Sequence, residues 1–213
     1  MRTSDLISSL TNNVTPVKRL RSPWVRASRW LLLASVVLGL LTVMQGVRPN
    51  FMEKMQQPSF FIGMLASLLT GVFATIATFM VSLPDRSRRW LLLPLPTLLL
   101  WVANIGYQCL EGWVPVRHGD VSLGIATSCL ATLVLTSLPL SLAMFAMLRY
   151  SAAFRPMPVI LMASLAVSAL TANALSMFHP MDATVMILGW NLGVALIFAL
   201  LAMLFGRRAI QLE

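Results

Sequence analysis

Six long apolar stretches, each about as long as a bilayer is thick, constrain this chain more than any other feature. A helix needs about 20 predominantly apolar residues to cross the hydrocarbon core of a membrane. Each stretch reaches that length between flanking charges, prolines or glycines. The stretches are 27–47, 60–83, 90–110, 121–148, 157–177 and 183–205. The sequence therefore predicts an all-α fold, an integral membrane bundle of six transmembrane helices.

Composition supports a membrane protein and leaves too little chain for a soluble catalytic domain. Hydrophobic residues make up 58% of the 213 positions and charged residues 11%, whereas a typical soluble domain has about 25% charged residues. The predicted domains are an N-terminal tail (1–26), a six-helix membrane domain (27–205) and a short C-terminal tail (206–213).

Lysine and arginine are unevenly divided between the two sides of the predicted bundle. Thirteen lie before the first span, between spans two and three, between spans four and five, or after span six. Three lie on the opposite side: Arg48, Lys54 and Arg117. Because short loops rich in Lys and Arg stay in the cytoplasm, both tails are predicted to be cytoplasmic.

The N-terminal tail carries a short amphipathic segment. One apolar stripe on a helix is formed by Leu6, Ile7, Leu10 and Val14. A helix this short is marginal in water, so the membrane, the rest of the protein or a partner must bury the stripe. We expect this segment to be a helix that docks on a partner through the apolar stripe. The other residues expected to bind the partner are Asp5, Lys18, Arg19 and Arg21.

The stretch 16–30 allows a second interpretation. It is basic, bounded by proline, and contains Trp24 and Trp30. Juxtamembrane basic residues bind anionic lipid, and tryptophans gather in the belt at the membrane surface. Lipid anchoring therefore explains this stretch as well as partner binding does.

The turn before the sixth span contains His179 and Asp182. The simplest role of Asp182 is to cap the sixth helix, its carboxylate accepting from free backbone N–H groups. His179, with Met177 and Met186 nearby, offers imidazole and thioether ligands for a metal. The methionines have a simpler explanation as lipid-facing filler. His179 and Asp182 are kept as candidate sensing residues.

The two cysteines are Cys109, at the end of the third span, and Cys129, in the outer half of the fourth. The short connection predicts that these spans are antiparallel neighbours, which would let the two side chains meet. A disulfide or a shared soft metal ion would then make the pair a sensor. The alternative is that each cysteine is a small apolar residue packed between helices.

No pattern in the sequence predicts catalysis or pumping. No Lys, Arg, Asp or Glu lies deep in a span, although a pump generally keeps such a charge near mid-membrane. Amides are expected to join the helices instead: Gln45, Asn104, Asn173 and Asn191. Prolines are expected to bend the third and fourth spans: Pro94, Pro96 and Pro139.

Three short segments carry a resemblance to a known family. They are Met1-Arg2-Thr3-x-Asp5-Leu6-Ile7, then Pro16-Val17-x-Arg19-Leu20 ahead of a tryptophan, and the most specific one, Phe178-His179-Pro180-x-Asp182-Ala183-Thr184-Val185. Together with the six spans they resemble the NrsF family of bacterial membrane anti-sigma factors, over essentially the whole chain. The resemblance implies a negative regulator that holds an extracytoplasmic-function sigma factor, of the sigma-F type, inactive at the inner membrane.

The resemblance also implies a response to heavy-metal or oxidative stress that depends on cysteines, which we carry over to Cys109 and Cys129. We therefore predict a membrane anti-sigma factor, and not an enzyme, in the inner membrane of a bacterium. Its sigma-binding surface would be the tail with the short basic loops. Its partners would be the sigma factor and the bilayer, without direct nucleic-acid contact or a small-molecule substrate. No cofactor is predicted beyond a transient soft metal ion, for which the candidate ligands are Cys109, Cys129 and His179.

Two other functions fit the same composition. One is a small transporter or channel for a metal ion or small solute, and the other is a structural partner of another membrane protein. A transporter would move a solute in proteoliposomes without any cytoplasmic partner, whereas an anti-sigma factor would not.

Overall fold

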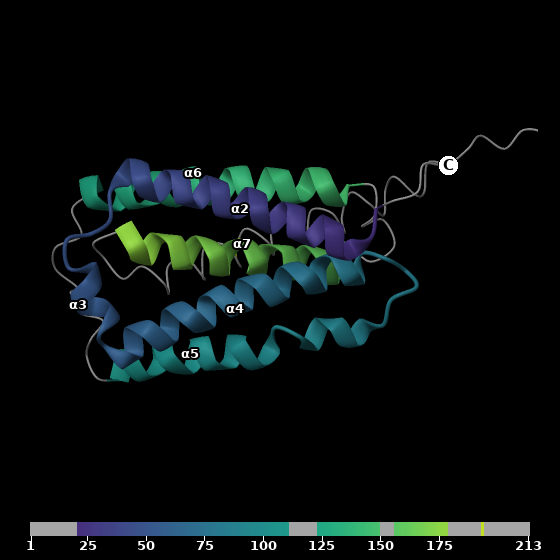
Figure 1. The fold of residues 1–213 in the computed structure, drawn as a ribbon, viewed down its shortest axis with the longest axis horizontal. Coiled ribbons are helices and arrows are strands. Elements are labelled where there is room, and N and C mark those ends of the chain that lie inside the picture. The colour runs from purple at the N-terminus through teal and green to yellow at the C-terminus, as the bar shows by residue number, and fades with distance from the viewer. Residues whose placement is uncertain (1–20, 111–122, 150–155, 179–192, 194–213) are drawn as a thin grey trace, which may run out of the picture.

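A computed structural model describes residues 21–110, 123–149 and 156–178, together with Gly193 (Figure 1). The elements are α2 (Pro23–Gln45), α3 (Phe51–Met55), α4 (Pro58–Val81), the 3-10 helix η1 (Arg88–Leu92), α5 (Leu95–Leu110), α6 (Leu123–Leu148) and α7 (Pro156–Phe178). Five segments are long and apolar enough to cross a membrane: α2, α4, η1 with α5, α6 and α7. They coincide with the first five predicted spans, which confirms an all-α, multi-pass architecture. The sixth predicted span, 183–205, lies outside the described residues except for Gly193.

Helix α7 lies at the centre of the described bundle. In Figure 1, α2 and α6 run along one side of it, while α4 and then α5 run along the other. The largest helix interface is between α4 and α7, and α7 also packs on α6 and α2. The most apolar window of α7 is 67% buried, against 22% for α2. Protein therefore surrounds α7, whereas α2 leaves much of its surface for lipid.

Small and hydroxyl side chains let α4 and α7 approach closely. A Cβ atom placed on Gly71 of α4 would lie 2.6 Å from Cγ of Leu170 on α7, so a side chain at this position would displace Leu170. The hydroxyls of Thr70, Thr75 and Thr78 each donate to the carbonyl four residues earlier, at 2.7 Å. Each hydroxyl is thereby satisfied within its own helix, which avoids the cost of an unpaired polar group in an apolar interior.

Two of the predicted amides join helices. Asn173 Nδ2 on α7 donates to the carbonyl of Met64 at 2.7 Å and to Oγ of Ser67 at 3.2 Å, both on α4. Asn104 Nδ2 on α5 donates to the carbonyl of Ser59 on α4 at 3.0 Å. These bonds confirm the predicted role for both residues. Gln45 is exposed at the end of α2. Asn191 lies outside the described residues, so its predicted role stays a prediction.

Helix α2 begins four residues before the start of the predicted span 27–47 and ends two residues before the end of that span. Ser22 caps its start, where Oγ accepts from the N–H of Val25 at 3.5 Å, and Pro23 occupies the first helical position, for which its fixed φ is suited. Gly46 ends the helix with φ at +79°, a conformation that strains residues with a side chain. Local cap chemistry, rather than hydropathy, therefore sets both ends.

The third span, which was predicted to bend at its prolines, is interrupted there. The 3-10 helix η1 ends at Leu92 and α5 begins at Leu95, on either side of Pro94, whose missing N–H interrupts a helix. Pro139 lies inside α6, which is one helix over its full range. The structure also contains a helix that was not predicted: the five-residue α3, in the connection between α2 and α4.

Trp30 is a core residue, so its assignment to an interfacial belt is wrong. Its side chain is 0% exposed, and Nε1 donates to the carbonyl of Leu140 on α6 at 3.4 Å. Ala27 and Ala34 are buried about one turn to either side of it. These small neighbours leave room for the indole ring between α2 and α6. Trp24, in contrast, is 54% exposed.

Candidate functional site

The described arginines gather at one end of the bundle, which we call the basic end. Here α2, η1 and α7 begin, and α4 and α6 end. Seven arginines and one acid, Asp85, lie at this end; the arginines are Arg21, Arg26, Arg29, Arg86, Arg88, Arg89 and Arg149. The opposite end has Arg48, Glu53 and Lys54 among the described residues. The fold thus brings together at one end the loops whose positive charge the sequence analysis assigned to one side of the membrane.

The N-terminal tail joins the bundle beside the connection between α4 and η1. Trp24, in the first turn of α2, packs edge-on against Trp90 of η1, with ring centroids 6.1 Å apart and planes at 83°. Edge-to-face aromatic pairs contribute about 0.5–1.5 kcal/mol beyond their buried area. Arg21, directly before α2, is exposed. The start of α2, to which the tail is attached, therefore lies next to the α4–η1 connection.

Arg26 is the one arginine of the basic end, within the described part of the chain, that is buried, with 6% of its surface exposed. Its Nη2 donates to the carbonyl of Met147 on α6. Its Cζ atom lies 5.1 Å from the ring centroid of Phe79 on α4, within the range of a cation–π contact. Arg26 therefore connects three helices.

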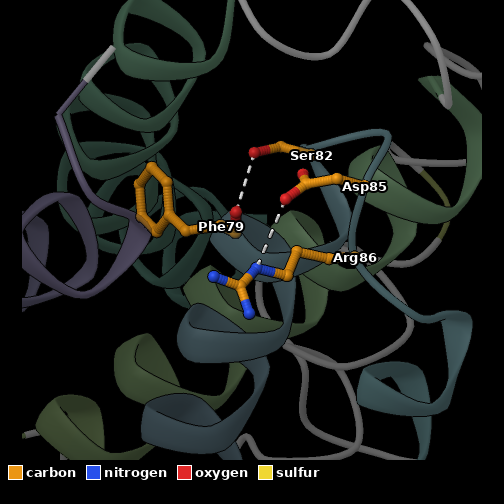
Figure 2. Close-up of polar contacts among 4 residues, drawn as sticks. All are labelled: Phe79, Ser82, Asp85 and Arg86. Carbon is orange, nitrogen blue, oxygen red and sulfur yellow. Dashed lines mark hydrogen bonds and ion pairs between the residues drawn. The ribbon is translucent and has the colours of Figure 1, made fainter.

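The connection between α4 and η1 is short and presents its charges to the exterior (Figure 2). Ser82 Oγ donates to the carbonyl of Phe79 at 2.8 Å, which secures the end of α4. Asp85 and Arg86 form an ion pair at 3.8 Å, with side chains 70% and 48% exposed. An exposed pair of this kind contributes about 0–1 kcal/mol, so it leaves the net positive charge of the loop available to an acidic partner.

The 3-10 helix η1 continues this exposed basic surface. Ser87 Oγ accepts from the N–H of Arg89 at 3.2 Å and so starts the helix. The side chains of Arg88 and Arg89 are exposed. Together with Arg86 they form an arginine cluster next to Trp90, which contacts the start of α2.

At the opposite end, Arg48 is also buried, with 6% of its surface exposed. Its Cζ atom lies 5.2 Å from the ring centroid of Phe60 on α4. Its backbone N–H donates to the carbonyl of Met177 on α7 at 3.1 Å. Phe60 also packs edge-on against Phe51 of α3, at 6.3 Å between centroids. Arg48 therefore holds the last turn of α7, after which the chain leads to the turn with His179.

The predicted sensing residues fall at or beyond the limits of the described chain. Cys109 lies in α5 and Cys129 in α6, while His179 and Asp182 lie outside the described residues. Helix α5 packs on α4, whereas α6 packs on α7 and α2, and α5 and α6 lie at opposite edges of the bundle in Figure 1. The prediction that these two spans are packed neighbours is therefore wrong.

The physical reason is the length of the connection. Twelve residues, 111–122, join the two helices, and an extended chain of that length reaches about 40 Å. Proximity in sequence therefore did not require packing in space. A direct bond between the two cysteines would need α5 and α6 to approach each other.

The predicted partner-binding residues fall mainly outside the described chain: Asp5, Leu6, Ile7, Leu10, Val14, Lys18 and Arg19. Arg21 is described and exposed. Within the described residues, no three His, Cys, Asp or Glu side chains lie close enough together to hold a metal ion.

Sequence reasoning missed the burial of Arg26 and Arg48. Both were counted as loop arginines on the basis of charge alone. A usable signal was present for Arg26, because the buried residues of α2 are spaced as one helical face: Arg26, Ala27, Trp30 and Ala34. For Arg48, which follows the end of α2, no such periodicity exists.

Comparison with known proteins gives one match. The family model described as NrsF, negative regulator of sigma F, matches residues 10–211. No curated protein and no solved structure matches the chain.

Proposed function

The chain belongs to the NrsF family of anti-sigma factors, the negative regulators of sigma F, and from this premise we propose how it does its work. It holds an extracytoplasmic-function sigma factor of the sigma-F type at the bacterial inner membrane and releases it on heavy-metal or oxidative stress. As a regulator of this family it is not an enzyme. Both of its termini lie in the cytoplasm.

The basic end of the bundle supports this proposal. It lies where the tail enters α2, and its exposed arginines Arg86, Arg88 and Arg89 stand beside that entry. A basic surface attracts acidic patches of a protein partner and speeds their encounter. The apolar stripe of the tail supplies the specific contact, and the arginine cluster supplies the charge. In occupying a surface that DNA would otherwise bind, the regulator keeps the sigma factor from its promoters.

Release requires two arrangements of the bundle with different affinities for the sigma factor. We assign the sensing role to Cys109 and Cys129, with His179 and Asp182 as weaker candidates at the same end. A thiolate binds soft metals tightly, and oxidation joins thiols only when their Cα atoms come within about 7 Å. Helices α5 and α6 are apart in the described arrangement. Binding of a metal by both thiolates, or a disulfide between them, would therefore favour a different arrangement of the helices.

The experiment that tests the proposal is recovery of the sigma factor with the regulator. The full-length protein is purified from detergent-solubilised membranes, and its stoichiometric partner is identified without prior selection. The variant Leu6→Asp/Leu10→Asp should lose the sigma factor and switch on its genes, while its level in the membrane stays normal. The matched control is Ser8→Asp/Asn12→Asp, which adds the same charge to the other face of the tail helix and should still repress.

Three results would contradict parts of this proposal. If no sigma factor is recovered with the wild-type protein, the sigma-binding role is wrong. If repression survives in Leu6→Asp/Leu10→Asp, the tail is a lipid anchor and the docking surface lies in the loops. If the purified protein moves a solute in proteoliposomes, the transporter interpretation replaces it.

A further inference from the structure

Arg26 is buried at a point where two helices end and a third begins. It lies in the first turn of α2, its Cζ atom is 5.1 Å from the ring centroid of Phe79 near the end of α4, and its Nη2 donates to Met147 in the last turn of α6. Arg29, one turn further along the same helix, is exposed. The burial of Arg26 is therefore specific to its position and is not a general property of this stretch.

The contact with Met147 has a clear physical role. The last four carbonyls of a helix have no partner within the helix, and a cation at that end is favoured by the helix dipole. Met147 is next to the last residue of α6, so its carbonyl belongs to that group. Arg26 thus caps α6 while its guanidinium face rests on Phe79, and a flat, forked cation suits both contacts at once.

The location of Arg26 also bears on the tail. The tail is covalently attached only through the start of α2, and Arg26 lies five residues after Arg21, where the described chain begins. A second side-chain contact of this first turn is the Trp24–Trp90 pair. The position of the residues to which the tail is attached therefore depends on how Arg26 and Trp24 are held.

We propose that Arg26 is a positioning residue, which fixes the start of α2 to α4 and α6 and so holds the attachment point of the tail beside the arginine cluster formed by Arg86, Arg88 and Arg89. The inference rests on the proposed sigma-binding role of the tail. It differs from that role because Arg26 itself does not touch the sigma factor. A change at either Phe79 or Met147 would reach the tail through this one side chain.

The test compares Arg26→Gln, Arg26→Lys and Arg29→Gln in the full-length protein. Arg26→Gln and Arg29→Gln remove the same charge from the same helix, but only the first removes the buried contacts. Arg26→Gln should lower recovery of the sigma factor about tenfold, the change that about 1.4 kcal/mol produces. Arg26→Lys keeps a cation near the Met147 carbonyl and should recover most of the binding. Arg29→Gln should bind as the wild type does.

A second measurement separates positioning from a general loss of structure. In hydrogen–deuterium exchange of the detergent-solubilised protein, Arg26→Gln should speed exchange in the first turns of α2 and the last turn of α6. Exchange around Gly71 and Leu170, in the middle of the α4–α7 interface, should stay unchanged, because the Arg26 contacts lie at the ends of α4 and α6.

Three results would overturn the inference. The first is wild-type binding by Arg26→Gln, and the second is an equal loss in Arg29→Gln, which would mean that charge alone matters. The third is faster exchange throughout the bundle in Arg26→Gln, which would make Arg26 a residue of general stability. If the wild-type protein recovers no sigma factor, the proposed function fails, and the exchange measurement alone still decides whether Arg26 holds the start of α2.

Discussion

Helices α4 and α7 approach closely at Gly71. We predict that replacing Gly71 by alanine lowers the stability of the folded protein. A Cβ atom at this position would lie 2.6 Å from Cγ and 2.7 Å from Cδ2 of Leu170, and 3.3 Å from its backbone nitrogen. Carbon atoms in contact prefer about 3.5–4.0 Å, so Leu170 must move by roughly 1 Å. Cγ is held close to the backbone, and rotation of the terminal methyl groups alone cannot relieve the clash.

The magnitude follows from the cost of overpacking. An extra methylene forced into a packed core costs about 1–3 kcal/mol, and Leu170 is 6% exposed in the most extensive helix interface of the described bundle. Gly39 of α2 is the matched control, because a Cβ atom there meets nothing within 4 Å. The gain in helix propensity from glycine to alanine is common to both variants. Gly71→Ala should therefore be less stable than Gly39→Ala by about 1–3 kcal/mol.

The assay is unfolding in mixed micelles of rising SDS fraction, followed by circular dichroism. A double-mutant cycle with Leu170→Ala identifies the cause, because removing the Leu170 side chain should make Gly71→Ala nearly neutral. The expected coupling is about 1–3 kcal/mol, within the range for residues in direct contact. Equal stability of Gly71→Ala and Gly39→Ala, or a coupling near zero, would refute the close contact between α4 and α7.

Three more predictions concern the amide link, the topology and the cysteines. Asn173→Leu removes two hydrogen bonds to α4 and should cost about 1 kcal/mol in the same titration, the usual size for such bonds in membranes; an unchanged midpoint would contradict this. A periplasm-active phosphatase fused after Glu213 should be inactive and one fused after Arg48 active, and the reverse pattern would overturn the proposed orientation. Cys109→Ser and Cys129→Ser should each uncouple reporter induction from metal and oxidant without loss of protein; normal induction in the double variant would make both cysteines packing residues.

The sequence was sufficient to predict the membrane helices because hydropathy is a local property. Five spans appear where apolar stretches were found, with ends displaced by a few residues wherever a cap such as Ser22 or a glycine such as Gly46 decides the boundary. The roles of Asn104 and Asn173 were also predictable, since an amide in an apolar interior must find a partner.

Which helices are neighbours was less predictable, because it depends on side chains distant in sequence. The sequence distance between α5 and α6 suggested contact, but α4 and α7 hold them on opposite edges of the bundle. Trp30 could belong to a membrane surface by composition, and it is buried because Ala27 and Ala34 make space for it against α6. Composition specifies which residues avoid water, but not whether lipid or protein covers them.

The distribution of contacts along α2 suggests where regulation can act on this bundle. A groove of about 400 Å³ separates the middle of α2 from α4 and α7, and the helix is little buried. Its ends are different: Arg26 stacks on Phe79 at one and Arg48, just past the other, stacks on Phe60. These two cation–π contacts tie α2, and the chain just past it, to α4 at both ends of the helix, in addition to the packing of Ala34 in the core.

The free energy of these contacts can be compared with the free energy difference that a two-state switch requires. A desolvated cation–π contact contributes about 2 kcal/mol and a hydrogen bond from a charged group about 1.5–3 kcal/mol. A shift between states from 1:99 to 99:1 needs about 5.5 kcal/mol of differential binding. The tenfold loss of binding expected for Arg26→Gln corresponds to about 1.4 kcal/mol, so the Arg26 contacts supply part of that difference and the sensing event must supply the rest. An event at the Arg48 end that moves α2 would therefore act on the attachment of the tail in part through the way Arg26 is held.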